Sequence, residues 1–307
     1  MEDRHHGGEL VTGNLVLGLG GTVDFEVAWD ADVLGALAVE YGITADELTT
    51  MAPILDERGL VVTVLGFVAT GAGGERFVAS SEIVARFAAR FDTAVTLGGT
   101  GVRAGLALDR LGIPSVQHLV SIDDNVRRLL PPSMTYVSSA TADTLDPHLI
   151  VQYPAGANVQ LAAGGTITAP GANRIILAND PPNREMALAA DLPDALADAA
   201  VFLISGFNTM TDADLLARRL DDLRAAMERL RGDALVYYED AGFYERSFSR
   251  RIRARLLSRI DVYGMNEDEM QEYLARAVDL LAPREVAAAL RDLHRLIPAR
   301  ALVLHTR

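Results

Sequence analysis

Several features are scarce or missing in this chain, and each absence narrows the range of functions. The 307 residues contain no cysteine, which excludes disulfides, a thiol nucleophile and a cysteine-type zinc site. The formal net charge of −14 argues against general binding to nucleic acid or to anionic membranes, which requires clustered basic side chains. The polar N-terminus lacks an apolar signal core, and no uncharged apolar run reaches the ~18 residues of a membrane span. We therefore expect a soluble cytoplasmic protein.

What is present points to an α/β fold. Half of the residues are hydrophobic, so the chain can build a sizeable core. Apolar strands alternate with helical patterns on either side of a segment, residues 131–179, that has short strand candidates and no helical periodicity. This alternation predicts a mostly parallel sheet with helices on both faces and a small, mainly β insertion. We predict a large domain from residues 1–59, 80–130 and 180–307, and a small β-rich lid from 60–79 and 131–179.

Three local predictions depend on apolar content and turn signals. Leu15–Val23 is predicted as one buried strand that ends at Asp24. Thr44–Asp56 is predicted as a helix, because Thr44 and Glu47 have the spacing of a capping box. Leu60–Ala79 is predicted as a β-hairpin, because a β-rich run is followed by four residues that include three glycines and then by a short strand.

A glycine-rich turn within Phe91–Pro114 is the stretch around which we expect the chain to be organised. A strand ends near Leu97, and Gly98, Gly99 and Gly101 then lead into a helix. Glycines let a ligand approach the backbone, and the free N–H groups at the start of a helix attract polar or anionic atoms. Gly99-x-Gly101-x-x-Ala104 also matches the dinucleotide fingerprint, with Asp123 closing the next strand at about 20 residues. A Rossmann-type NAD(P)-binding protein is therefore an alternative, although the β-rich segment fits such a module poorly.

Polar side chains at strand ends are the candidate ligands of a site, because ligands in parallel sheets bind beyond the carboxyl ends of the strands. Two carboxylates could accept hydroxyl groups of a sugar, an arginine fork suits phosphate, and acidic strand ends could hold magnesium through water. The residues are Asp24, Glu75, Arg174, Asn208, Glu239, Asn266 and Glu269. Each also has a structural interpretation as a cap or surface residue, and Asn266 with Glu269 has the form of a capping box. His148 and His305 are interpreted as core or surface histidines.

Taken together, these motifs resemble the ADP-dependent glucokinase and phosphofructokinase family, within the ribokinase-like sugar kinases. The similarity runs in order from about Leu15 to His305. It is carried by LGLGGTVDFEV, TGAGGE, TLGGTGVRAGLALDRLG, HLIVQYPAG with PGANRIILANDPPN, LISGFNTM, YYEDAGF and YGMNEDEM, with LVLHT as the last strand. The resemblance implies a ribokinase-like large domain with an inserted β lid.

The resemblance also implies a reaction, the transfer of the β-phosphate of ADP to a hexose or hexose phosphate with magnesium, giving AMP. It assigns sugar binding to Asp24, Glu75, the Gly98, Gly99 and Gly101 turn, and Asn208 in a strand-end motif. It assigns phosphate to Arg174 and magnesium to Glu239, Glu269 and Asn266. Positioned oxygens and charge neutralisation are what phosphoryl transfer chiefly requires.

Two departures from the family pattern are visible. Tyr237 stands at the histidine of the family's H-x-E motif, and no G-x-G-D motif, which supplies the catalytic base, occurs in the 307 residues. We therefore expect a fragment or a shortened chain, with little or no kinase activity on its own. A non-catalytic sugar- or nucleotide-binding relative is the second alternative.

The sequence does not fix the acceptor or the oligomeric state. A sugar phosphate needs an added basic residue near the glycine turn, and Arg103 is the candidate. Arg103 slightly favours a phosphofructokinase or dual specificity over glucose alone.

Overall fold

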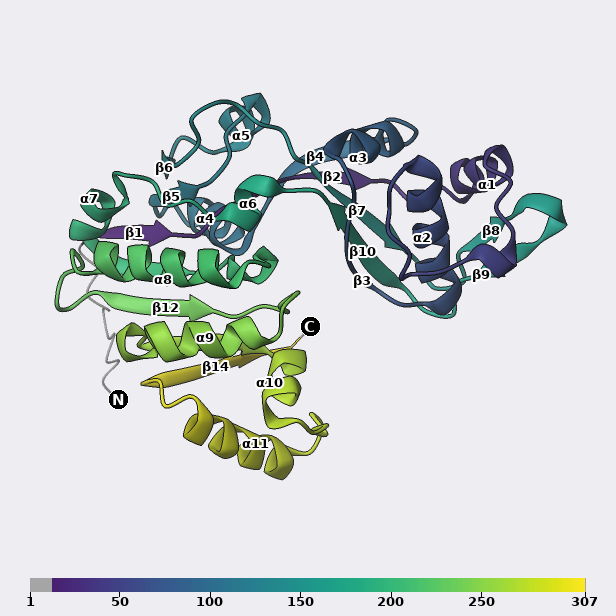
Figure 1. Cartoon of the computed structure of the whole chain (residues 1–307). Helices are drawn as coiled ribbons and strands as arrows, with labels where there is room; N and C mark the ends of the chain where they lie inside the picture. The colour runs from purple at the N-terminus through teal and green to yellow at the C-terminus, as the bar shows by residue number, and fades with distance from the viewer. Residues whose placement is uncertain (1–12, 307) are drawn as a thin grey trace, which may run out of the picture.

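The computed structural model describes residues 13–306, and a seven-stranded parallel sheet forms its larger part (Figure 1). The strand order of this large sheet is β14-β13-β12-β11-β1-β5-β6, and every neighbouring pair is parallel. The strands are β1 Asn14–Leu17, β5 Ser115–Leu119, β6 Met134–Ser138, β11 Ala199–Ile204, β12 Leu235–Glu239, β13 Val262–Asn266 and β14 Ala301–His305. The predicted α/β class is confirmed.

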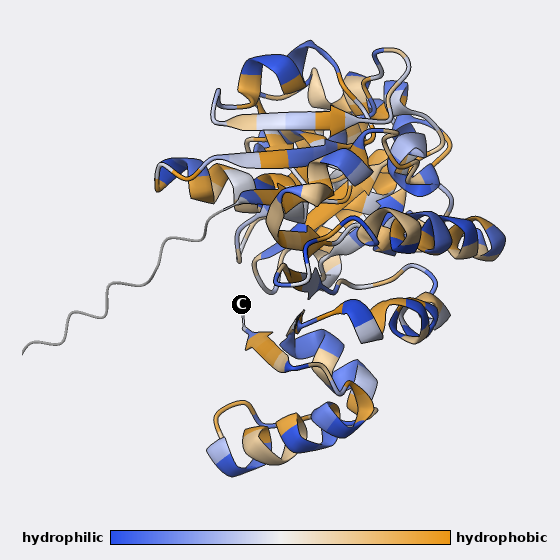
Figure 2. Cartoon of the chain, turned by 90° about the vertical axis from the view of Figure 1, so that its left-hand side faces the viewer, coloured by the Kyte–Doolittle hydropathy of each residue, from blue (hydrophilic) through white to orange (hydrophobic). Residues whose placement is uncertain are grey.

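Helices pack along both faces of the large sheet. Later strands of the chain are added on both sides of β1, with β5 and β6 on one side and β11 to β14 on the other. Because the crossover connections are right-handed, the helices of the two sides lie on opposite faces of the sheet. The connecting helices are α4 Thr100–Arg110, α5 Asp124–Leu129, α6 Pro181–Glu185, α7 Leu192–Ala197, α8 Ala213–Met227, α9 Ser247–Leu256, α10 Glu267–Leu274 and α11 Pro283–Leu296. Helix α8 buries an apolar stripe made of Leu216, Leu220, Leu223 and Met227. Figure 2 shows hydrophobic residues gathered inside and hydrophilic ones on the outer sides of the helices.

A second, mixed sheet lies beside the large one (Figure 1). The order of this small sheet is β3-β10-β7-β2-β4. Its strands are β2 Thr22–Val27, β3 Gly74–Phe77, β4 Thr93–Gly98, β7 His148–Tyr153 and β10 Asn173–Ala178, and a hairpin of β8 Asn158–Gln160 and β9 Thr166–Thr168 stands apart. The helices α1 Ala31–Glu40, α2 Glu57–Thr70 and α3 Ser81–Ala88 share its hydrophobic core.

The predicted hairpin over Leu60–Ala79 is wrong, because its first half is helix α2 and its second half, β3, pairs in parallel with β10. Its run of β-branched and apolar residues has no single stripe because α2 is buried nearly all round, and a fully buried helix looks like a buried strand in sequence. Asp56 caps α2 by accepting from the Gly59 N–H at 2.7 Å, and Gly71 ends it with φ of +67°. The predicted helix over Thr44–Asp56 is also wrong. Its capping box is present but caps only a 3₁₀ turn, Ala45–Glu47.

The predicted strand Leu15–Val23 is two strands in two sheets. The chain leaves the large sheet after Leu17 and enters the small sheet at Thr22, so Asp24 lies inside β2 rather than after β1. Likewise β4, which precedes the glycine turn, pairs antiparallel with β2 in the small sheet. A Rossmann module requires β4, α4 and β5 to form a parallel unit in one sheet, and this arrangement differs from it.

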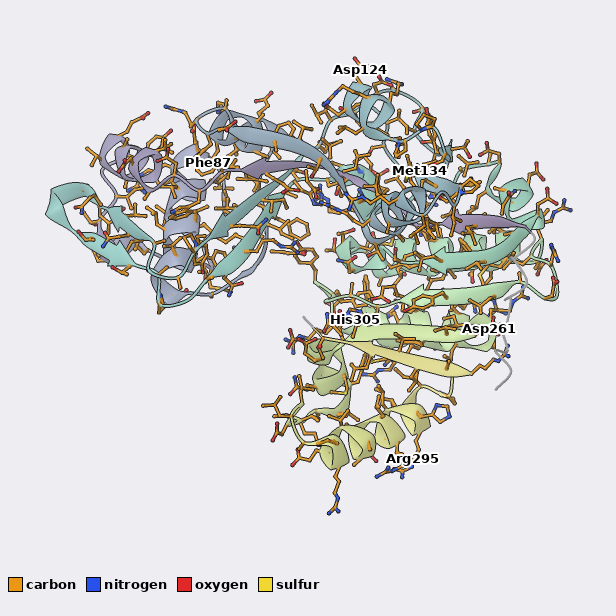
Figure 3. The ribbon with its side chains drawn as sticks, turned by 180° about the vertical axis from the view of Figure 1, so that it is seen from behind. Phe87, Asp124, Met134, Asp261, Arg295 and His305 are labelled. Atoms are coloured by element: carbon orange, nitrogen blue, oxygen red, sulfur yellow. The ribbon has the colours of Figure 1, made fainter. Side chains whose placement is uncertain are left out.

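The sheet pairings assign some segments differently from the sequence. Strands β2 and β4, placed by sequence in the large domain, pair in the small sheet, whereas β6, placed in the lid, pairs in the large sheet. The carboxyl ends of β13 and β14 point toward the side on which the small sheet lies. Figure 3 shows this, with His305 at that end of the large sheet and Asp261 at the far end. No helix in residues 13–306 is long and apolar enough to cross a membrane.

Candidate active site

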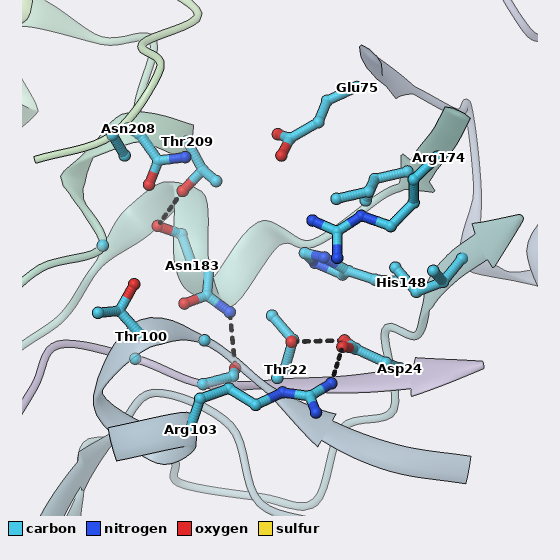
Figure 4. A pocket seen from close by; sticks show the side chains of 18 of the residues that line it. Thr22, Asp24, Glu75, Thr100, Arg103, His148, Arg174, Asn183, Asn208 and Thr209 are labelled. Carbon is cyan, nitrogen blue, oxygen red and sulfur yellow. Dashed lines mark hydrogen bonds and ion pairs between the residues drawn. The ribbon is translucent and has the colours of Figure 1, made fainter. Parts of the chain in front are cut away.

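A cavity of about 750 Å³ lies where the two sheets meet. We call it the junction cavity. The small sheet contributes to it, together with α4, α6 and the segments after β1 and β11 of the large sheet (Figure 4). Its lining residues include Thr22, Asp24, Glu26, Glu75, Gly98, Gly99, Arg103, His148, Ile150, Gln152, Arg174, Ile176, Asn183, Asn208 and Thr209. Of the predicted sugar and phosphate residues, all but Gly101 line it.

The small sheet forms one wall of the junction cavity by simple alternation. Side chains two residues apart on a strand share a face, so β2, β7 and β10 each present every second residue to the cavity. The register places Glu26 beside Ile150, Ile150 beside Ile176, and Ile176 beside Glu75. The wall therefore has an apolar centre with a carboxylate at each end.

Asp24 is the most buried carboxylate of the cavity and is only 7 % exposed. Thr22 Oγ1 donates to its Oδ1 at 2.6 Å, and Arg103 Nη2 lies 3.4 Å from its Oδ2 (Figure 4). The side chain is thus held at a fixed place with one lone pair of each oxygen used. The remaining lone pairs can accept hydroxyl groups.

The glycine turn fits directly against Asp24. A Cβ on Gly98 would lie 2.6 Å from Asp24 Oδ1 and closer still to Oδ2 and to Thr22 Oγ1, so only glycine fits there. Gly99 precedes α4 with φ of +90°, a conformation that favours glycine. Gly101 instead packs against β1, where its Cβ would lie 3.1 Å from Gly18 N. Gly101 therefore allows the start of α4 to pack closely against the end of β1, outside the cavity.

Glu75, Arg174 and Asn208 reach the cavity from three different elements. Glu75 lies on β3, Arg174 on β10 and Asn208 in the 3₁₀ turn Phe207–Thr209 after β11. Burial and the neighbouring Glu75 carboxylate raise the pKa of Tyr244, whose ring stacks on Phe77 with centroids 4.3 Å apart. This contact joins the small sheet to the segment after β12. Figure 4 shows Glu75 and Arg174 pointing into the same space.

A partly buried His148–Asp180 pair is the main feature that sequence reasoning missed. His148 Nε2 lies 2.9 Å from Asp180 Oδ2, and Asn183 Nδ2 donates to the same oxygen at 2.7 Å. Burial lowers the pKa of His148, but the hydrogen bond and charge of Asp180 outweigh it, so the net shift is upward. The partners lie 32 residues apart, and only the register of β2 with β7 brings the histidine beside Asp24.

The acidic strand ends predicted to hold magnesium gather at the carboxyl end of the large sheet. His305 Nε2 lies 2.7 Å from Glu239 Oε1. Asn266 and Glu269 form the capping box of α10, in which the Asn266 N–H donates to Glu269 Oε2 at 2.8 Å. Burial raises the pKa of Glu269 to about 7, and the nearby charges of Asp240 and Glu239 add to the shift. Burial and Glu239 also raise the pKa of Tyr237 to about 12.

These side chains do not form a complete metal cage. Within residues 13–306, no three histidine or acidic side chains converge in a way that could hold a metal ion. Magnesium, however, keeps several waters and needs only one or two protein carboxylates. The mutual repulsion of Glu239 and Glu269 is what a hydrated divalent cation would relieve, so the donor set fits a water-mediated site. Ala241 lines both the junction cavity and the pocket that contains Glu269, so the two sites adjoin.

Comparison with known proteins agrees with this geometry. Residues 13–299 match the model of the ADP-specific phosphofructokinase/glucokinase conserved region. A search of curated proteins gives no match. Similar solved structures include a hypothetical ADP-dependent phosphofructokinase from Pyrococcus horikoshii OT3, with 16 % identity, a TM-score of 0.72, and coverage of 96 % of this chain and 74 % of that one.

Two further structures are similar. The last common ancestor of ADP-dependent phosphofructokinases from Methanosarcinales has a TM-score of 0.72 at 13 % identity, over 96 % of this chain and 69 % of that one. An ADP-dependent kinase in complex with fructose-6-phosphate and ADPbetaS has a TM-score of 0.67 at 12 % identity, over 95 % of this chain and 67 % of that one. These likenesses establish the ribokinase-like fold. The family match covers most of the chain, which therefore belongs to the ADP-specific phosphofructokinase/glucokinase family.

Proposed function

We propose that this protein is an ADP-dependent sugar kinase whose acceptor binds in the junction cavity. The observation that carries the proposal is the convergence of Asp24, Glu75, Asn208 and the Gly98 backbone on one polar space between two sheets. In the reaction, the acceptor hydroxyl oxygen forms a bond to the β-phosphorus of ADP, the bond from that phosphorus to the bridging oxygen breaks, and AMP leaves. The hydroxyl proton passes to a base or to solvent.

The acceptor side of the reaction uses the small sheet as a lid. Asp24 and Glu75 accept hydroxyl hydrogen bonds from opposite ends of the wall, and Asn208 contributes an amide from the turn that follows β11. Closure of one sheet on the other would exclude water from the transferring phosphoryl group. We place this reaction in glycolytic sugar metabolism in the cytoplasm.

The phosphate side uses Arg174 and the acidic strand ends. The Arg174 fork is suited to the phosphate of ADP and neutralises its charge. Glu239 and Glu269, with Asn266 beside them, would hold the hydration shell of Mg²⁺, which supplies further charge neutralisation when bound. Glu269 must be ionised for this role, so its raised pKa predicts that magnesium binding strengthens with pH toward about 7.

A second candidate function is sugar binding without phosphotransfer. The 307 residues contain no G-x-G-D motif, and the cavity carboxylate nearest to the glycine turn, Asp24, is already bonded to Thr22 and Arg103. Asp24 is therefore held for orienting a hydroxyl group rather than for taking its proton as a general base.

One set of measurements separates the two candidates. AMP formation is followed with ADP or ATP as donor and D-glucose or D-fructose 6-phosphate as acceptor, and acceptor binding is measured in parallel by titration calorimetry. Sugar-dependent AMP formation from ADP supports the kinase. Binding of a sugar without formation of AMP supports the second candidate. If no sugar binds and no AMP forms, both candidates are refuted.

A further inference from the structure

The charges that line the junction cavity bear on which acceptor it takes. Three carboxylates, Asp24, Glu26 and Glu75, face two guanidinium groups, Arg103 and Arg174. Carboxylates are thus in excess. A hexose 6-phosphate carries close to two negative charges near neutral pH, since the second pKa of its phosphate is ~6. Its phosphate therefore needs cations that are not already neutralised.

Arg103 is already neutralised. Its Nη2 lies 3.4 Å from Asp24 Oδ2 and 3.4 Å from Glu26 Oε1, so one guanidinium bridges two carboxylates. Glu26 is itself held in place, because Thr96 Oγ1 donates to its Oε1 at 2.6 Å. A phosphate at Arg103 would have to displace one carboxylate and lie beside both. The expectation that Arg103 provides a phosphate subsite therefore meets an electrostatic obstacle.

The other cations near the cavity are also committed. Arg174 has no carboxylate within ion-pair distance among residues 13–306, but the proposed function uses it for the phosphate of ADP. His148 lines the cavity, and its ring is bonded to Asp180, whose charge offsets any positive charge on the ring. One cation is thus available, and the donor requires it.

The wall between the carboxylates suits an uncharged ring. Ile150 and Ile176 lie side by side in register, with Glu26 at one end of the row and Glu75 at the other. A hexose can place its C–H face on the two isoleucines while its hydroxyl groups donate to the carboxylates. A phosphate in either end position would meet a carboxylate instead.

We propose that the acceptor of this site is an uncharged hexose and that Arg103, bridged to Asp24 and Glu26, excludes sugar phosphates rather than binding them. This inference rests on the proposed function for the role of Arg174. Asp24 and Glu26 act here as a pair, since both hold the same guanidinium. Arg103 is accordingly a specificity-determining residue.

The test compares the affinities of D-glucose and D-fructose 6-phosphate by titration calorimetry without ADP. We expect glucose to bind at least about 100-fold more tightly. Glu26→Gln removes one of the two carboxylates on Arg103, and we expect it to shift the ratio of the affinities toward fructose 6-phosphate by about 10-fold. Asp143→Asn is the matched control, because it removes the partner of Arg127, 2.6 Å away, outside the cavity, and should leave the ratio unchanged.

The outcomes distinguish this inference from the proposed function. Tighter binding of fructose 6-phosphate, or an unchanged ratio in folded Glu26→Gln, overturns the inference but leaves the kinase standing. Glucose binding without AMP formation supports the inference and refutes the kinase. If neither compound binds, both are overturned. The wild-type comparison needs no variant, so a Glu26→Gln protein that fails to fold does not prevent a decision.

Discussion

Replacement of Gly98 by alanine tests the contact between the glycine turn and Asp24. The backbone of Gly98 is not in the left-handed region, so alanine adds no backbone strain, and its effect comes from the added methyl group alone. That methyl carbon would lie 2.6 Å from Asp24 Oδ1 and closer to Oδ2. Because both oxygens are within the forbidden distance, rotation of the carboxylate does not relieve the clash. Asp24 must move away from its bond with Thr22 and Arg103.

The magnitude follows from what Asp24 loses. A hydrogen bond to a charged group contributes roughly 1.5–3 kcal/mol, which corresponds to a roughly 10- to 150-fold loss of acceptor affinity. Overpacking of this kind costs a further ~1–3 kcal/mol of folding stability. The acceptor affinity is measured by titration calorimetry with D-glucose, and the folded state is checked by thermal unfolding.

Gly232→Ala is the matched control for this substitution. An added Cβ at Gly232 meets nothing within 4 Å, and its φ is likewise outside the left-handed region. We expect the control to keep the wild-type affinity. If folded Gly98→Ala binds glucose within about twofold of wild type while Gly232→Ala does the same, the assignment of Asp24 and the glycine turn to the acceptor site is refuted.

Three further predictions concern the acidic end of the large sheet. Asn266→Ala removes the side chain that accepts from two N–H groups of α10, and we expect a loss of about 1 kcal/mol in unfolding free energy by chemical denaturation. Because burial raises the folded-state pKa of Glu269 to about 7, the free energy of unfolding in metal-free buffer should fall as pH rises from about 5 to about 7, and Glu269→Gln should flatten that fall; a parallel pH profile would contradict the assignment. Asp240→Ala leaves three tyrosine hydroxyls without their shared buried acceptor, and we expect a loss of at least about 3 kcal/mol in denaturant titrations, against no change for the exposed Asp222→Ala.

The parts of the fold with clear periodicity could be predicted from sequence. The sequence predicts strands over Leu235–Glu239 and Ala301–His305, because each is a short apolar run between turn signals, and β12 and β14 have these bounds. The sequence of α8 likewise has a clear apolar stripe at helical spacing. Helix α2 could not be recognised in the sequence, because burial on all sides removes the polar face that marks a helix.

The candidate site was predicted as a set of residues but not as an arrangement. The glycine turn and Asp24 stood out because glycine runs and strand-end carboxylates are local signals. The break at residues 18–21 sends β1 and β2 into different sheets and coincides with Gly18, Gly20 and Gly21, a turn signal that the prediction of one strand did not use. The pairing of Arg103 with Asp24 and Glu26, and of His148 with Asp180, depends on strand register between distant segments, which no local pattern contains.

The central claim is that the junction cavity binds the sugar. A crystal structure of the protein grown with D-glucose tests it most directly. The account predicts one sugar between the two sheets, with hydroxyl groups on Asp24 and Glu75 and its ring against the Gly98 backbone. Crystals with an empty junction cavity at saturating glucose, or with the sugar bound elsewhere, would contradict it.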